Sequence, residues 1–239
     1  MRLPSRLLFV GAHCDDVELF AGGLLARACE EGLRVGVLVF SDHRGVLSAD
    51  LARQARREMQ DNLAWLSEAT GTPVEDHSGA MLGACDGSFV AERGSIYAAL
   101  ERLRSEYDLV VTHARADTNQ DHAQVAAEVT RVFKAHATVL GGEFPNNDAG
   151  GVCPQVYVPL SGFAVDAKAR MVEAYASQRR DGRPYLDGGL VRALARVRGA
   201  QVRSEAAEAF EVGGRVVVGE AVAPGAQASS NTAAIRSPA

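Results

Sequence analysis

The feature of this sequence that most constrains its fold is an apolar run near the amino terminus that stops abruptly at polar residues. Residues 7–10 have the composition of a β-strand and are too few for a helix, whereas the apolar residues from Glu18 onward recur at helical spacing. His13, Asp15 and Asp16 therefore fall on a strand-to-helix turn, where α/β sheets place their chemistry. His13 and Asp16 are close enough in the chain to bind one divalent cation.

The same acidic residues also have a purely structural explanation. An aspartate before a helix commonly caps it, because the carboxylate accepts hydrogen bonds from free amide groups and interacts favourably with the positive helix end. His13 and Asp16 provide only two ligands, and zinc requires three or more. A third ligand from elsewhere in the chain would favour the metal site over the cap.

The composition limits the class of protein. A chain of 239 residues, 47% of them hydrophobic, is long enough for one α/β domain with a full core. Its net charge of -5 provides no basic field, so we expect no nucleic-acid partner. The four cysteines show neither zinc-knuckle nor dense disulfide spacing, and no stretch is apolar enough to span a membrane. We expect a cytoplasmic protein without a membrane span, and the sequence leaves a homo-oligomer open.

Strand-like and helix-like segments alternate along the chain. This alternation predicts a Rossmann-like α/β fold, a mostly parallel sheet with helices on both faces. We expect the main strands to begin near Leu7, Val35, Val74, Leu109 and Thr138, with later strands over residues 156–160 and 216–218. The periodicity predicts helices over residues 18–32, 48–69, 95–106, 123–135, 166–178 and 190–197. We expect residues 1–221 to form one domain and residues 222–239 to form a disordered tail.

A second group of polar residues, at 112–122, follows the fourth predicted strand and precedes a helix. Because the carboxyl ends of neighbouring parallel strands meet at one edge of a sheet, His122 could reach His13 and Asp16 and complete a His-Asp-His set. Asp121 or Asp117 could then orient a ligand imidazole. The alternative is that Asp117 and its neighbour Asn119 are turn or cap residues.

The two motifs, AHCDDVELF at residues 12–20 and DTNQDHAQV at residues 117–125, resemble the signature pair of the PIG-L/LmbE family of zinc-dependent de-N-acetylases. Residues 138–145, 174–178 and 208–210 are similar to later segments of that family. The resemblance implies that zinc, or another divalent transition metal, is bound by His13, Asp16 and His122, and that Asp15 is the general base. It also implies an N-acetylated sugar substrate that is hydrolysed to an amine and acetate.

The sequence departs from the family pattern at three positions. Cys14 replaces a usual proline, which affects a turn more than the chemistry. Asn119 stands where many members have a histidine that stabilises the oxyanion or protonates the leaving amine, and an amide cannot deliver a proton. The family's substrate-contacting arginine would fall on Ala55, with Arg56 and Arg57 beside it.

From these matches we take Asp15, Asp121 and Asn119 as candidate catalytic residues and Arg57 as the candidate substrate-binding arginine. His43, at the end of the second predicted strand, could approach the site, but we expect it to be a loop histidine in solvent. A set of later side chains could face a sugar, although the first of them is equally plausible as a packing residue: Tyr175, Ser177, Gln178 and Tyr185.

Two other functions remain open at this point. One is a non-catalytic sugar- or nucleotide-binding module on the same scaffold, which the loss of a histidine at Asn119 favours. The other is an amidase that acts on a different amide. Dinucleotide binding is a poor candidate, because Gly11 and the pair Gly22-Gly23 do not form the GxGxxG pattern.

Overall fold

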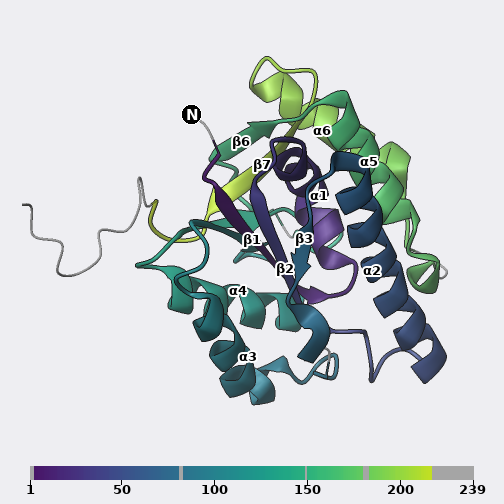
Figure 1. The fold of residues 1–239 in the computed structure, drawn as a ribbon, viewed down its shortest axis with the longest axis vertical. Helices are drawn as coiled ribbons and strands as arrows, with labels where there is room; N and C mark the ends of the chain where they lie inside the picture. The colour runs from purple at the N-terminus through teal and green to yellow at the C-terminus, as the bar shows by residue number, and fades with distance from the viewer. Residues whose placement is uncertain (1–2, 81–82, 149, 180–182, 217–239) are drawn as a thin grey trace, which may run out of the picture.

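The computed structural model describes residues 3–80, 83–148, 150–179 and 183–216, so the tail predicted at 222–239 lies outside it. Within these ranges one seven-stranded sheet has the order β3-β2-β1-β4-β5-β7-β6 (Figure 1). The strands are β1 (Arg6–His13), β2 (Arg34–Ser41), β3 (Val74–Asp76), β4 (Leu109–His113), β5 (Thr138–Gly142), β6 (Val156–Pro159) and β7 (Ala207–Val212). The helices are α1 (Asp16–Glu30), α2 (Ala49–Thr70), α3 (Phe89–Leu103), α4 (Gln120–Phe133), α5 (Gly162–Glu173) and α6 (Gly188–Gln201), with short 3-10 turns η1 (Ser78–Ala80) and η2 (Ala176–Gln178).

Strands β1 to β5 are parallel, which confirms the predicted Rossmann-like class and the five predicted strand starts to within one residue. From β1 the chain first adds β2 and β3 on one side and then β4 and β5 on the other. The order therefore reverses between β1 and β4. Open α/β sheets bind their ligands at such a reversal, outside the carboxyl ends of the strands.

Side chains alternate between the two faces of β1, as the pleat of a strand requires. Leu7 and Phe9 pack in a core with residues of α1, α2 and α5, whereas Leu8 and Val10 pack with residues of α3 and α4. Figure 1 shows these two helical layers on opposite sides of the sheet. Because both faces are covered, the central strands are almost completely apolar.

Two helices differ most from their predicted limits. The sequence predicted a start at residue 95 for α3, but the helix begins at Phe89 and contains Gly94, which faces open space and is tolerated there. The helix predicted over 166–178 ends at Glu173 as α5, and the 3-10 turn η2 follows separately. This break matters, because it directs Gln178 toward the cavity described below.

The last strand along the chain is β7, which lies between β5 and β6 in the sheet and which the sequence analysis did not predict. β7 runs antiparallel to β5 and β6. The prediction of an edge strand at 216–218 is not supported, because Val216 lies outside any strand and 217–218 lie outside the described ranges. Two buried acids, Glu208 and Glu211, break the apolar pattern of β7, and each has partners inside the protein.

Among the helices in the described ranges, none has both the length and the hydropathy that a membrane crossing requires.

Glu208 provides a test of how β7 holds α1. Inside α1, Ala21 has non-helical angles, and the amide groups of Gly23 and Leu24 donate to the Glu208 carboxylate at 2.9 and 2.6 Å. Lys168 Nζ donates to the same carboxylate at 2.6 Å. Because removal of one partner leaves a buried charge uncompensated, we expect Glu208→Ala to lower the free energy of unfolding by roughly 3–5 kcal/mol. Urea unfolding measures this loss.

The matched control is Glu205→Ala, because Glu205 is exposed and lies three residues before Glu208. It should change stability by less than about 0.5 kcal/mol. Equal effects of the two substitutions would show that Glu208 does not hold α1.

Candidate metal centre and active site

A cavity of about 510 Å³ opens at the carboxyl edge of the sheet. Its lining residues come from the segments that follow β1, β2, β3, β4 and β5, and from Gln178 of η2 with Arg183 and Tyr185. The cavity therefore lies at the reversal of strand order between β1 and β4. Both sequence motifs reach it, as the parallel arrangement predicts.

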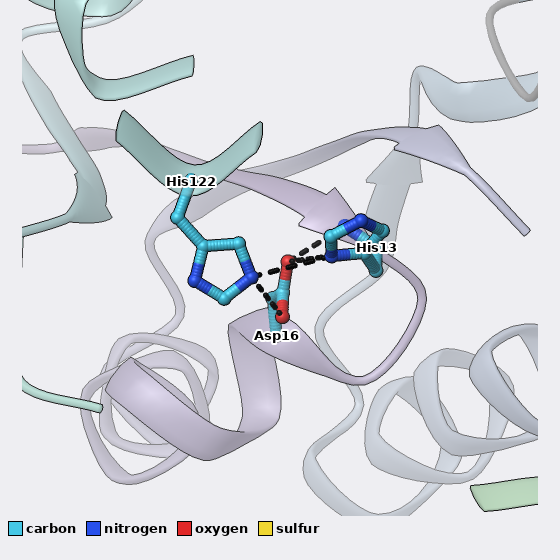
Figure 2. Close-up of side chains that lie close together, drawn as sticks. All are labelled: His13, Asp16 and His122. Atoms are coloured by element: carbon cyan, nitrogen blue, oxygen red, sulfur yellow. Dashed lines mark hydrogen bonds and ion pairs between the residues drawn. The ribbon is translucent and has the colours of Figure 1, made fainter. Parts of the chain in front are cut away.

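The floor of the cavity holds His13, Asp16 and His122, shown in Figure 2. His13 ends β1, Asp16 begins α1, and His122 lies in the first turn of α4. His13 Nδ1 is 3.2 Å from His122 Nε2, and the two oxygens of Asp16 lie 3.3 Å from these nitrogens. All three side chains are buried, and they offer one ligand atom each within 4.8 Å of one another.

Asp117 holds the imidazole of His122 in a defined orientation. Its Oδ2 lies 2.7 Å from Nδ1 of His122, so Nδ1–H donates and Nε2 faces His13 and Asp16, where it would present its lone pair to a bound cation. Carboxylate partners of this kind fix the tautomer of metal-ligating histidines. Two imidazole nitrogens and one carboxylate around a common point are a donor set that fits zinc or a similar divalent transition metal. The sequence left Asp117 and Asp121 as alternatives for this role, and Asp117 is the residue in contact with His122.

Asp121 lies instead on the other side of His13. Nε2 of His13 is 3.4 Å from Asp121 Oδ2 and 3.5 Å from Asp86 Oδ1. Asp121 Oδ2 also accepts the backbone amide of Gly87 at 2.6 Å, which fixes the carboxylate. Asp121 therefore faces the imidazole of His13 as Asp117 faces that of His122.

Charge holds the three floor side chains together. Burial alone would raise the pKa of Asp16, but the neighbouring histidines outweigh it and hold that pKa well below its usual range. Burial lowers the pKa of His122, yet Asp16 and Asp117 outweigh it and raise the value to about 10. His122 is therefore protonated at neutral pH when no cation is bound, and a bound cation would replace that proton.

The prediction that His43 is a loop histidine in solvent is wrong. His43 is buried, stacks on His13 with ring centroids 4.8 Å apart, and places Nε2 3.1 Å from Asp15 Oδ1. Its Nδ1 is 3.2 Å from Asp86 Oδ2. His43 has a φ of 64°, which is uncommon for residues other than glycine and occurs often at functional sites. The sequence could not show this contact, because it depends on how far the loop after β2 folds back.

Asn119 both caps a helix and lines the cavity, so the two interpretations of it from sequence are compatible. Its Oδ1 accepts the amides of Asp121 at 2.8 Å and His122 at 3.4 Å, which makes it the N-cap of α4. The cap uses the side-chain oxygen. The amide nitrogen remains available as a hydrogen-bond donor at the cavity wall.

The sequence profile of the PIG-L family, described as GlcNAc-PI de-N-acetylase, matches residues 8–133, more than half of the chain. The match contains both motifs and every ligand candidate. The chain belongs to the PIG-L family. The resemblance inferred from the two motifs is thus confirmed, and no protein with curated annotation was found to match this chain.

Solved structures share this PIG-L fold over most of their length. The conserved protein TT1542 from Thermus thermophilus is 25% identical, with a TM-score of 0.62 over 87% of this chain and 94% of its own. The N,N'-diacetylchitobiose deacetylase from Pyrococcus horikoshii is 15% identical, with a TM-score of 0.63 over 87% and 83%. The zinc-inhibited form of teicoplanin deacetylase Orf2 is 17% identical, with a TM-score of 0.61 over 86% and 96%.

His113 is a buried residue beneath the PIG-L motifs to which the sequence analysis gave no definite place. Its ring stacks on His122 with centroids 3.8 Å apart, and its Nε2 accepts the backbone amide of Ala12 at 3.1 Å. Burial and the neighbouring His122 lower the pKa of His113 to about 4, so the ring is neutral. His113 therefore supports the ligand histidine from below and ties β4 to β1.

Of the two possibilities left open for Tyr175, the structure shows packing. Tyr175 is completely buried, and its hydroxyl lies within hydrogen-bond distance of both the carbonyl oxygen of Cys14 and Glu18 Oε1. It thus anchors the turn in which Cys14 replaces the proline usual in the family. Ser177 also points away from the cavity floor, toward Glu58 on α2, whereas Gln178 and Tyr185 do line the cavity.

Arg57, the predicted substrate-binding arginine, lies away from the cavity. Arg57 is exposed on α2 and is not among the residues that line the cavity. Among the described residues, the arginine that lines the cavity is Arg183. Arg183 lies beyond the family match at 8–133, so the two motifs carried no signal for it.

Metal analysis tests the ligand set. We expect the wild-type protein to bind one zinc ion and His122→Ala to lose it, because two remaining ligands cannot hold the ion tightly. Elemental analysis after dialysis gives the stoichiometry. His136→Ala is the control, because His136 is an exposed histidine at the opposite end of the same helix. Unchanged zinc in His122→Ala would remove His122 from the site.

Proposed function

We propose that this PIG-L family protein hydrolyses an N-acetyl group on an amino-sugar-containing small molecule and releases acetate. The observation that carries the proposal is the buried His13–Asp16–His122 set with the carboxylate of Asp15 beside it in one cavity. Two structural neighbours whose names describe deacetylases of sugar-containing compounds support the substrate class. The cavity volume, about 510 Å³, is within the range of small-molecule sites.

His13, Asp16 and His122 would hold zinc or another divalent transition metal. Bound there, the ion would act as a Lewis acid that polarises the acetamide carbonyl and lowers the pKa of water. Asp117 and Asp121 would keep the two imidazoles in the ligand orientation. The remaining steps fall to side chains of this chain.

Asp15 is the proposed general base. It lines the cavity, and its Oδ1 is held 3.1 Å from His43 Nε2, which limits the directions in which the carboxylate can point. Asp15 would take a proton from the attacking water as the carbon–oxygen bond forms. When the carbon–nitrogen bond breaks, the same carboxyl group would return that proton to the amine nitrogen. The amide of Asn119 can donate a hydrogen bond but is not acidic enough to transfer a proton.

Asn119 would then act only through its amide nitrogen. The cap of α4 fixes the side chain by its oxygen, so the NH₂ group is presented to the cavity without a further conformational choice. From that position it would donate a hydrogen bond to the carbonyl oxygen as negative charge develops there. Such donors typically contribute roughly a hundred- to a thousandfold to the rate.

The direct test is acetate release from a panel of N-acetylated amino sugars by the zinc-loaded protein. We expect release from at least one compound of the panel and none after the metal is chelated. Sugar binding by calorimetry without any acetate release would contradict the proposal. It would favour the non-catalytic binding module instead. Release only from N-acetylated compounds without a sugar would favour an amidase of different specificity.

Asp15→Asn tests the base. The substitution keeps the size of the side chain, so zinc stoichiometry should be unchanged while turnover falls by about a hundredfold or more. Asp42→Asn is the control, since Asp42 is a buried aspartate that pairs with Arg44 and does not line the cavity. Normal acetate release from zinc-loaded Asp15→Asn would show that the base is another group.

A further inference from the structure

One wall of the cavity carries two hydrogen-bond donors, on Gln178 and Arg183, that the proposed chemistry does not use. Both side chains line the cavity. Neither lies within the family match at 8–133. Their surroundings differ sharply from the acidic floor, where Asp15, Asp16, Asp86 and Asp121 gather.

Gln178 is rigidly placed. The turn that carries it is tied to α2, because the amide and hydroxyl of Ser177 donate to Glu58 at 3.2 and 2.5 Å. The side chain of Gln178 is completely buried, and its Oε1 accepts from Arg183 Nη1 at 2.6 Å. Its Nε2 has no hydrogen-bond partner among the described residues. A buried donor that faces a cavity without an acceptor is unfavourable unless a ligand or water supplies one.

Arg183 places a positive charge beside that donor. Its hydrogen bond to Gln178 is to a neutral amide oxygen, and among the described residues no carboxylate forms an ion pair with it. Several other arginines of the described chain do pair with carboxylates, as Arg44 does with Asp42 and Arg93 with Glu128. Among the described lining residues, Arg183 is the single lysine or arginine. A guanidinium with free N–H groups matches the oxygens of a carboxylate or phosphate.

An aromatic wall connects this pair to the metal ligands. Phe144 packs against His122 with ring centroids 5.3 Å apart, and Tyr185 packs edge-on against Phe144 at 5.8 Å. Burial raises the pKa of Tyr185 to about 12, so its hydroxyl is neutral beside Arg183. A sugar ring can lie against these aromatic faces with one end at the acidic floor and the other at Arg183.

We propose that Gln178 and Arg183 form an anion subsite that binds a carboxylate or phosphate carried by the amino-sugar substrate. The proposal rests on the proposed deacetylation and deepens it by naming the substrate class. The acidic carboxylates of the floor repel the anionic group, and Arg183 attracts it. The substrate is thereby oriented with its acetamide at His13, Asp16 and His122.

Three probes test the subsite on the zinc-loaded protein. N-acetylglucosamine is neutral, N-acetylmuramic acid carries a carboxylate, and N-acetylglucosamine 6-phosphate carries a phosphate. We expect kcat/KM for at least one acidic probe to exceed that for the neutral sugar by about tenfold or more, the scale of one charge-assisted hydrogen bond. Which acidic probe is preferred identifies the anion. A neutral sugar hydrolysed as well as both acidic probes overturns the proposal.

Variants assign the preference to residues. Arg183→Gln should remove the preference for the acidic probe, whereas Arg179→Gln should keep it. Arg179 is a matched control, because it lies in the same segment, donates to the carbonyl of Glu173 and does not line the cavity. A preference that survives in Arg183→Gln overturns the proposal. Gln178→Leu should weaken the preference as well, and the half-exposed Arg183 keeps the test decisive if the buried Gln178 variant does not fold.

Binding separates this proposal from the proposed function. In the Asp15→Asn background, where we expect hydrolysis to be slowed by about a hundredfold or more, calorimetry with the acidic probes measures binding apart from turnover. We expect Arg183→Gln to weaken their affinity by about tenfold or more. Arg183-dependent binding without acetate release by the wild type would end the proposed function and leave the anion subsite standing. Binding that ignores Arg183 would end the subsite, whatever the wild type hydrolyses.

Discussion

The rest of this structure depends on the contacts of one group, the carboxylate of Asp16 at the start of α1. One oxygen accepts the backbone amide of His13 at 2.6 Å and also lies 3.2 Å from His113, and the other faces His122. A single buried charge therefore connects the ends of β1 and β4 with the first turn of α4. Buried charges are tolerated only when they are paired, and here the pairing groups are the histidines that the site needs.

Different residues surround His122 and His13 and hold their rings in place. Asp117 and the neutral His113 hold His122, and Asp121 and Asp86 face the outer nitrogen of His13. Asp15 is held apart from these carboxylates by His43, whose pKa Asp15 and Asp86 raise to about 10 against the effect of burial. Neighbouring aspartates thus have distinct surroundings: Asp16 and Asp117 contact the two ring nitrogens of His122, and Asp15 contacts His43.

The sequence predicted much of this arrangement and failed in specific places. The parallel strands, the two motifs and the meeting of His13, Asp16 and His122 follow from local patterns, because apolar runs and strand-end polar clusters are readable without contacts. His43, β7 and Arg183 were missed or misplaced because their roles depend on tertiary contacts. His43 contacts Asp15, and Glu208 of β7 contacts α1, both far along the chain. Arg183 contacts the nearby Gln178, but its place at the cavity depends on how the fold positions that segment. No local period records such a pairing.

Asn119 has a consequence for how this chain can change. The residue caps the helix that carries His122, and its side-chain oxygen accepts hydrogen bonds from the backbone amides of Asp121 and His122. A histidine, the residue that many family members have there, is not among the preferred N-cap residues. An Asn119→His substitution would add a proton donor and at the same time loosen the first turn of α4, which carries His122. The chemistry of the cavity wall and the start of this helix are therefore coupled, and a histidine at this position would need another residue to cap α4.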